Sequence, residues 1–138
     1  MPRLPALLLA LAVLTAPAAA DNDKKPPIHK ITQSVSYVMI DPIYATILDG
    51  NRPIGLLMVG IGLDVPDADL RARVNRDMPA LRDAYVRSLM LFAATSVRSW
   101  RQPDVSAVAD RLQRVTDRML NHEGARILLA QVALRLTH

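Results

Sequence analysis

Hydrophobic and polar side chains alternate in the first part of the chain, and this alternation predicts β-strands. In the stretch 35–48, one face of a half-buried strand is expected to carry Val35, Tyr37 and Met39. Asp41-Pro42 is expected to break this run, because proline lacks the N–H donor that a strand ladder needs. Ile43–Leu48 is therefore predicted as a second strand.

A turn followed by a longer apolar run predicts a hairpin. Asp49-Gly50-Asn51 is a strong turn signal, and Pro53 precedes the run Ile54–Val65. Five alternate positions of that run are expected to share one face: Leu57, Val59, Ile61, Leu63 and Val65. The opposite face carries Gly60 and Gly62, and glycines on a strand often mark a bulge or a close backbone approach.

Helical spacing follows in three segments. Asp67 is a suitable N-cap for a helix over Ala68–Asn75. A long helix is predicted over Met78–Trp100, with Pro79 in its first turn, where a missing N–H costs little. One stripe at helical spacing is expected to contain Leu81, Tyr85, Leu89, Phe92, Ser96 and Trp100.

A third helix is predicted after Pro103-Asp104, to about Asn121, with Gly124 as a plausible stop. Its apolar stripe is expected to consist of Val105, Val108, Leu112, Val115 and Met119. The last run, Arg126–Thr137, permits a helix, but its alternating Leu, Val and Ala positions favour a strand. The whole pattern predicts an α+β domain, with an antiparallel sheet packed against about three helices.

The N-terminus has the pattern of a secretory signal peptide. Arg3 precedes the apolar stretch Leu4–Thr15, and small residues up to Ala20 suit cleavage before Asp21. The alternative is an uncleaved anchor in the inner membrane, although 17 residues interrupted by two prolines are short for a membrane span. We therefore expect a signal peptide at 1–20, a flexible tether at 21–33, a folded domain at 34–138 and a periplasmic location.

Composition narrows the function classes. The chain has 138 residues, of which 51% are hydrophobic and 22% charged, so it can form one well-packed domain. It has no cysteine, so its stability must come from the core and not from disulfides. The formal net charge is +4, but the basic residues do not gather with aromatics as they do in nucleic-acid-binding proteins. We expect no nucleic-acid partner.

Candidate chemistry is sparse. The imidazoles are His29, His122 and His138, and none has a partner at catalytic or metal-ligand spacing. Gly60-Ile61-Gly62 lacks the third glycine of a dinucleotide fingerprint, and the acidic residues at 64–69 lack the pattern of an EF-hand. We expect no enzyme activity, cofactor or metal, with an unrecognised hydrolase as a minor alternative.

The most distinctive surface is expected on the long helix. Leu89–Ala94 is apolar nearly all round, which predicts burial on two sides, either within the fold or between subunits. The arginines of this region outnumber the acids, which indicates a solvated face or a face for an acidic partner. The candidate interface residues are Met90, Leu91, Ala94, Arg82 and Arg87.

Over about Tyr37–Thr137 the chain resembles the periplasmic domain of the flagellar basal-body-associated FliL family. The most specific segment is Met78–Ala84, MPALRDA. Tyr37–Leu48 resembles the family's first strand, and Leu56–Val65 resembles its long apolar strand. Leu112–Leu120, followed by an apolar run, resembles its C-terminal part.

The resemblance implies a stomatin-like fold without enzymatic activity, ring-forming homo-oligomers at the inner membrane, and association with flagellar stator proteins in motility. Family members have a transmembrane helix where this chain has the pattern of a removable signal, and this departure separates two hypotheses. One is a self-associating FliL-like protein linked to the basal body. The alternative is a soluble periplasmic adaptor or envelope module with the same fold and no flagellar role.

Overall fold

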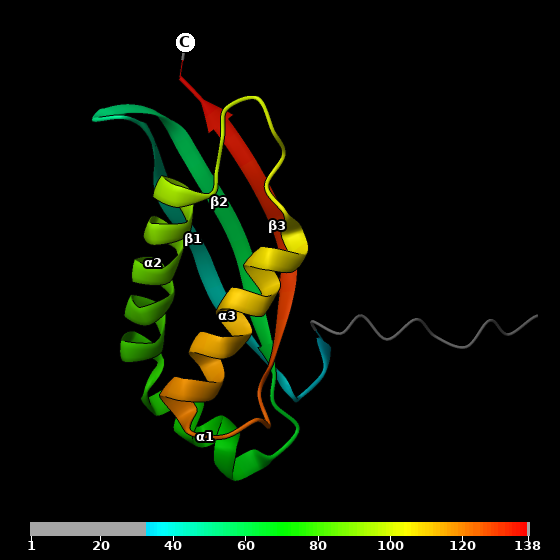
Figure 1. Cartoon of the computed structure of the whole chain (residues 1–138). Helices are drawn as coiled ribbons and strands as arrows, with labels where there is room; N and C mark the ends of the chain where they lie inside the picture. The colour runs from blue at the N-terminus through cyan, green and yellow to red at the C-terminus, as the bar shows by residue number, and fades with distance from the viewer. Residues whose placement is uncertain (1–32, 138) are drawn as a thin grey trace, which may run out of the picture.

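The computed structural model describes residues 33–137, which form a three-stranded antiparallel sheet and three helices (Figure 1). The elements in chain order are β1 (Tyr37–Asp49), β2 (Arg52–Asp64), α1 (Ala68–Arg76), α2 (Met78–Thr95), α3 (Val105–Leu120) and β3 (Arg126–Leu136). This confirms the predicted α+β class. The predicted signal peptide and nearly all of the predicted tether lie outside the described residues.

Strand β1 is continuous through Pro42, so the predicted break is wrong. The β1–β2 register steps from Ile40 opposite Ile61 to Ile43 opposite Val59, so that Asp41-Pro42 forms a bulge opposite Gly60. A bulged residue needs no ladder hydrogen bond, and this is why proline is tolerated there.

The buried face of β1 also differs from the prediction. Val38 and Ile40 are buried, whereas Met39 is 74% exposed. Val38 lies opposite Leu63 on the covered face of β2, and Met39 lies opposite Gly62 on the other face. The pairing register therefore decides which residues of β1 enter the core.

The predicted hairpin and the core face of β2 are confirmed. Asp49 pairs with Arg52 across a two-residue turn, and Gly50 has a φ of 61°, a backbone conformation that glycine adopts without a side-chain clash. The five alternate residues of β2 and its extension are all buried: Leu57, Val59, Ile61, Leu63 and Val65. As the central strand, β2 pairs with both neighbours.

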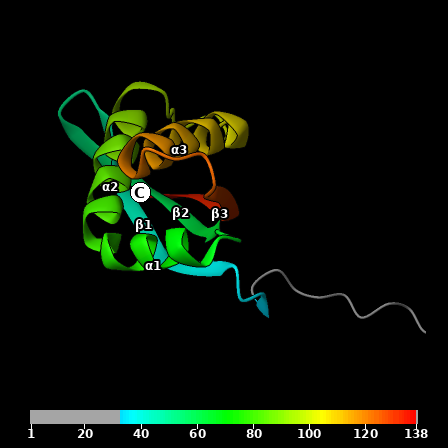
Figure 2. The same ribbon diagram turned by 90° about the horizontal axis from the view of Figure 1, so that it is seen from below.

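Helices α2 and α3 lie over the same face of the sheet, α2 against β1 and α3 against β3 (Figure 2). Asp67 caps α1 as predicted, with its Oδ1 accepting a hydrogen bond from the Leu70 amide at 2.6 Å. Helix α2 ends at Thr95, shorter than predicted. Trp100 lies in the following loop and is 82% exposed, so its predicted place in the helical stripe is wrong.

Helix α3 agrees with the prediction in length but not in its whole apolar stripe. Val108, Leu112 and Val115 are buried, while Val105 and Met119 are exposed at the two ends. Helix α3 is followed by Asn121 in the left-handed conformation, with φ 48°, so Asn121 takes the C-cap position for which Gly124 was considered.

The strand predicted at the C-terminus is confirmed as β3, but its alternation is interrupted. The β2–β3 register changes between Gly60 opposite Gln131 and Ile61 opposite Leu129, which leaves Ala130 as an extra residue. The residues packed toward the helices are therefore Ile127, Leu129, Val132 and Leu134.

Candidate functional site

The predicted interface on α2 includes two large apolar side chains that the described fold leaves exposed. Met90 is 53% exposed and Leu91 is 57% exposed, while Leu89, Phe92 and Ala93 are buried on the opposite side of the helix. The apolar run Leu89–Ala94 is thus covered on one side within the described residues. Its other side presents apolar surface to solvent.

The two arginines of the predicted interface have partners within the chain. Arg82 is half-buried, and its Nη1 donates a hydrogen bond to the Asp41 carbonyl oxygen at 2.8 Å, which joins α2 to the bulge of β1. Arg87 is exposed and pairs with Asp83 one helical turn earlier. Exposed pairs of this kind are easily exchanged for an external partner, because each contributes at most about 1 kcal/mol.

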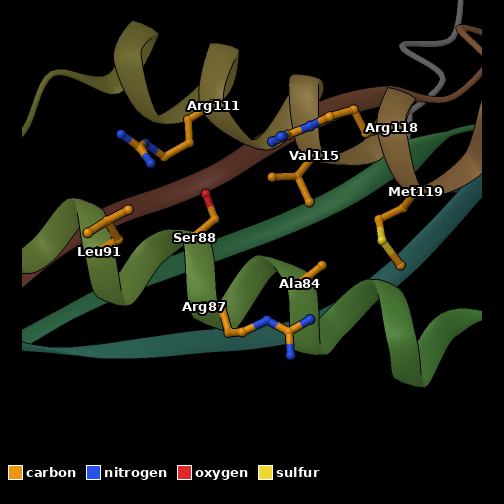
Figure 3. A pocket seen from close by; sticks show the side chains of 8 residues that line it. All are labelled: Ala84, Arg87, Ser88, Leu91, Arg111, Val115, Arg118 and Met119. Carbon is orange, nitrogen blue, oxygen red and sulfur yellow. The ribbon is translucent and has the colours of Figure 1, made fainter.

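A groove of about 470 Å³ lies between α2 and α3 (Figure 3). Helix α2 contributes Ala84, Arg87, Ser88 and Leu91, and helix α3 contributes Arg111, Val115, Arg118 and Met119. In the close view, Leu91, Ser88 and Ala84 extend from α2 toward α3, with Val115 between the two helices. The groove therefore has an apolar floor with cations along its α3 side.

The charge of this groove is positive. None of its eight lining residues is acidic. The guanidinium carbon of Arg111 lies 5.6 Å from the centre of the Phe92 ring, a cation–π distance. The Nε of Arg118 donates to the Arg114 carbonyl oxygen at 3.2 Å. Among residues 33–137, the salt bridges include neither Arg111 nor Arg118.

A second hollow, of about 290 Å³, lies where the hairpin turn approaches the loop after α2. It is lined by Ala94, by Val97–Trp100, by Leu48–Gly50 and by Ile54. Ala94 and Leu91 therefore line different hollows, and Met90 lines neither of them. The five predicted interface residues share a helix but do not form a single patch.

The groups with potential for chemistry do not converge. Burial raises the pKa of Tyr85 to about 12, and the charge of Asp117 acts in the same direction. This hydroxyl is in the core. His122 is exposed, with its Nδ1 accepting from the Gly124 amide, and His29 and His138 lie outside the described residues. Within residues 33–137, no cluster of His, Asp or Glu has the arrangement of a metal site.

Sequence reasoning did not select Arg111, Arg118 or Met119 for the site. Met119 was predicted in the apolar stripe of its helix, and the neighbouring helix that completes the groove was not known. The signal that could have found them is the spacing of Arg111 and Arg118, because residues seven apart lie on the same side of a helix.

Comparison with known proteins adds no relative: no family model matches the chain, and the search of curated proteins finds no match. None of the helices within the described part of the chain has the length and hydrophobicity needed to cross a membrane.

Proposed function

We propose that the chain is a non-enzymatic, self-associating periplasmic protein of the FliL type, linked to the flagellar basal body and its stator. In this proposal, Met1–Ala20 directs export, and the domain assembles through the exposed side of α2. Its role is that of a structural or regulatory component in motility. No catalytic step is assigned to it.

The observation that carries the proposal is the exposure of Met90 and Leu91 on a helix that is otherwise anchored to the sheet. A large apolar side chain that is more than half exposed contributes little free energy to folding. It contributes more when a partner removes its apolar surface from water. The second support is the pattern resemblance, whose most specific segment, Met78–Ala84, forms the first turns of the same helix.

A soluble periplasmic adaptor without a flagellar role remains the second candidate. The cleavable-signal pattern of residues 1–20 favours it, because a released domain has no membrane anchor of its own. Fold similarity alone does not decide between these two functions.

Deletion of the gene tests the flagellar part of the proposal. We expect the deletion to reduce swimming while filaments are still assembled, and the wild-type gene to restore it. Met90→Asp should fail to restore swimming. Met39→Asp, the same change at a 74% exposed methionine on the sheet face opposite the helices, should restore it. Unchanged swimming after deletion would favour the adaptor function.

A further inference from the structure

The groove between α2 and α3 combines an apolar floor with a cationic border. Its floor is apolar, with Ala84, Leu91, Val115 and Met119. Its border on α3 is cationic, with Arg111 and Arg118 (Figure 3). A ligand that suits both must itself have an apolar face flanked by negative charge.

The two helices also define the shape of the ligand. A groove between two packed helices accepts the side-chain ridge of a third helix. Binding of an amphipathic helix in such a groove is a common mode of peptide recognition. Arg111 and Arg118 are seven residues apart on α3. This spacing corresponds to two turns, or about 10.5 Å at 1.5 Å per residue. An acidic helix running beside α3 would match both arginines with carboxylates seven residues apart.

Both arginines are available for this role. The aromatic face of Phe92 holds Arg111, and the Arg114 carbonyl oxygen takes only the Nε of Arg118. Within residues 33–137, neither arginine is in a salt bridge. A carboxylate from a partner would therefore form a charge-assisted pair without displacing an internal acid.

We propose that this groove binds an acidic amphipathic helix of a partner protein. A second copy of the same groove is a poor occupant, because a face-to-face dimer would bring the arginines of both copies together. The helices of the described chain also lack an acidic face. Helix α1 has one acid and three arginines, α2 has one acid and two arginines, and α3 has two acids and three arginines.

This inference goes beyond the proposed self-association. Leu91 belongs to both surfaces, so the test changes only arginines and leaves Met90 and Leu91 as they are. The probe is a helical peptide of about 18 residues in an alanine–glutamine host, with two Glu seven positions apart and Leu three and four positions after the first Glu. Control peptides carry Lys in place of Glu, or the same residues in scrambled order. The full chain is titrated against each peptide, and fluorescence anisotropy measures the dissociation constant.

We expect the Glu peptide to bind at least tenfold more tightly than either control peptide. Arg111→Glu/Arg118→Glu should weaken it at least tenfold and should gain affinity for the Lys peptide. Arg52→Glu/Arg135→Glu makes the same charge change at the start of β2 and on β3, outside the groove, and should bind like wild type. Arg118→Glu alone repeats the test without disturbing the Arg111–Phe92 contact.

Three results would overturn the proposal. The first is equal binding of the Glu and scrambled peptides. The second is equal binding of the Glu peptide by wild type and by both groove variants, with circular dichroism confirming that they are folded. The third is no binding to the Glu peptide together with arginine-dependent binding to phosphatidylglycerol vesicles, which would assign the groove to a lipid surface. Sedimentation of the same variants reports self-association independently of each result.

Discussion

The hydroxyl of Tyr85 on α2 lies 2.7 Å from the hydroxyl of Thr116 on α3, and both side chains are fully buried. Thr116 uses its one hydrogen to donate to the Leu112 carbonyl oxygen at 2.8 Å. Tyr85 must therefore be the donor between the two hydroxyls. This pair fixes the two helices that border the groove relative to each other.

The direction of this hydrogen bond predicts unequal effects of two conservative substitutions. Tyr85→Phe removes the donor but leaves Thr116 bonded to Leu112, so the free energy of unfolding should fall by about 0.5–1.5 kcal/mol. Thr116→Val leaves the Tyr85 hydroxyl buried without an acceptor and should cost about 1–3 kcal/mol. Urea unfolding of both variants measures the difference. An equal or larger loss for Tyr85→Phe would contradict the assigned direction.

Tyr85 also predicts a loss of stability in alkali. Its pKa rises from 10.0 in the unfolded chain to about 12 in the fold. Below pH 10 both states keep the proton, so the contribution of Tyr85 is intact. As the pH rises from 10 toward 12, the unfolded state loses its proton first and is favoured.

At pH 11 this linkage should lower the free energy of unfolding by about 1.4 kcal/mol relative to pH 8. Urea unfolding of wild type and Tyr85→Phe at both pH values isolates the contribution of Tyr85 ionisation, because the two proteins share all other titrating groups. The variant should lose about 1.4 kcal/mol less than wild type. Equal losses would show that Tyr85 does not carry this dependence.

Two glycines of β2 should respond differently to the same substitution. A Cβ atom at Gly55 would lie 2.5 Å from the Arg135 carbonyl oxygen, which belongs to the backbone of β3. A Cβ atom at Gly60 would lie 3.6 Å from the Cβ of Gln131, an ordinary contact.

Gly55→Ala should therefore lower the free energy of unfolding by about 1–3 kcal/mol, because β2 and β3 must separate. Gly60→Ala is the matched control and should stay within about 0.5 kcal/mol of wild type or gain stability. Thermal or urea unfolding compares them. A Gly55→Ala variant as stable as Gly60→Ala would contradict the close approach of the two strands.

Features with local causes were predictable from the sequence. The turn at Gly50 and the capping role of Asp67 depend on residues that are adjacent in the chain. The buried face of β2 followed from five alternating apolar residues. Features that depend on a partner strand were not predictable: Met39 is exposed because β1 pairs with β2 in a register that places Val38 in the core. The bulge at Ala130 likewise depends on the partner strand, because the β2–β3 register changes between Gly60 and Ile61.

The candidate site divides in the same way. The stretch Leu89–Ala94 is apolar on all sides of its helix, which indicated more apolar surface than one sheet face can cover. In the structure, Met90 and Leu91 are exposed. The groove could not be predicted from the sequence, because its residues come from two helices whose packing against each other the sequence pattern does not determine. Trp100 has the spacing of a helical stripe in the sequence, but α2 ends five residues before it.

Export should release the domain from its N-terminal segment. After expression in a Gram-negative host, we expect an intact mass that begins at or near Asp21, in the soluble periplasmic fraction, because small residues precede Asp21. Retention of residues 1–20 in the inner membrane would contradict this expectation and restore the anchored design of the FliL family.

Self-association through α2 is the central claim, and sedimentation velocity of the purified chain over a range of concentrations tests it most directly. We predict that wild type and Met39→Asp sediment as the same oligomer, and that Met90→Asp, whose residue lies outside the groove, sediments as a folded monomer. A folded monomer for wild type at every concentration would contradict the claim. So would dissociation by Met39→Asp with assembly intact in Met90→Asp, which would place the interface on the open face of the sheet.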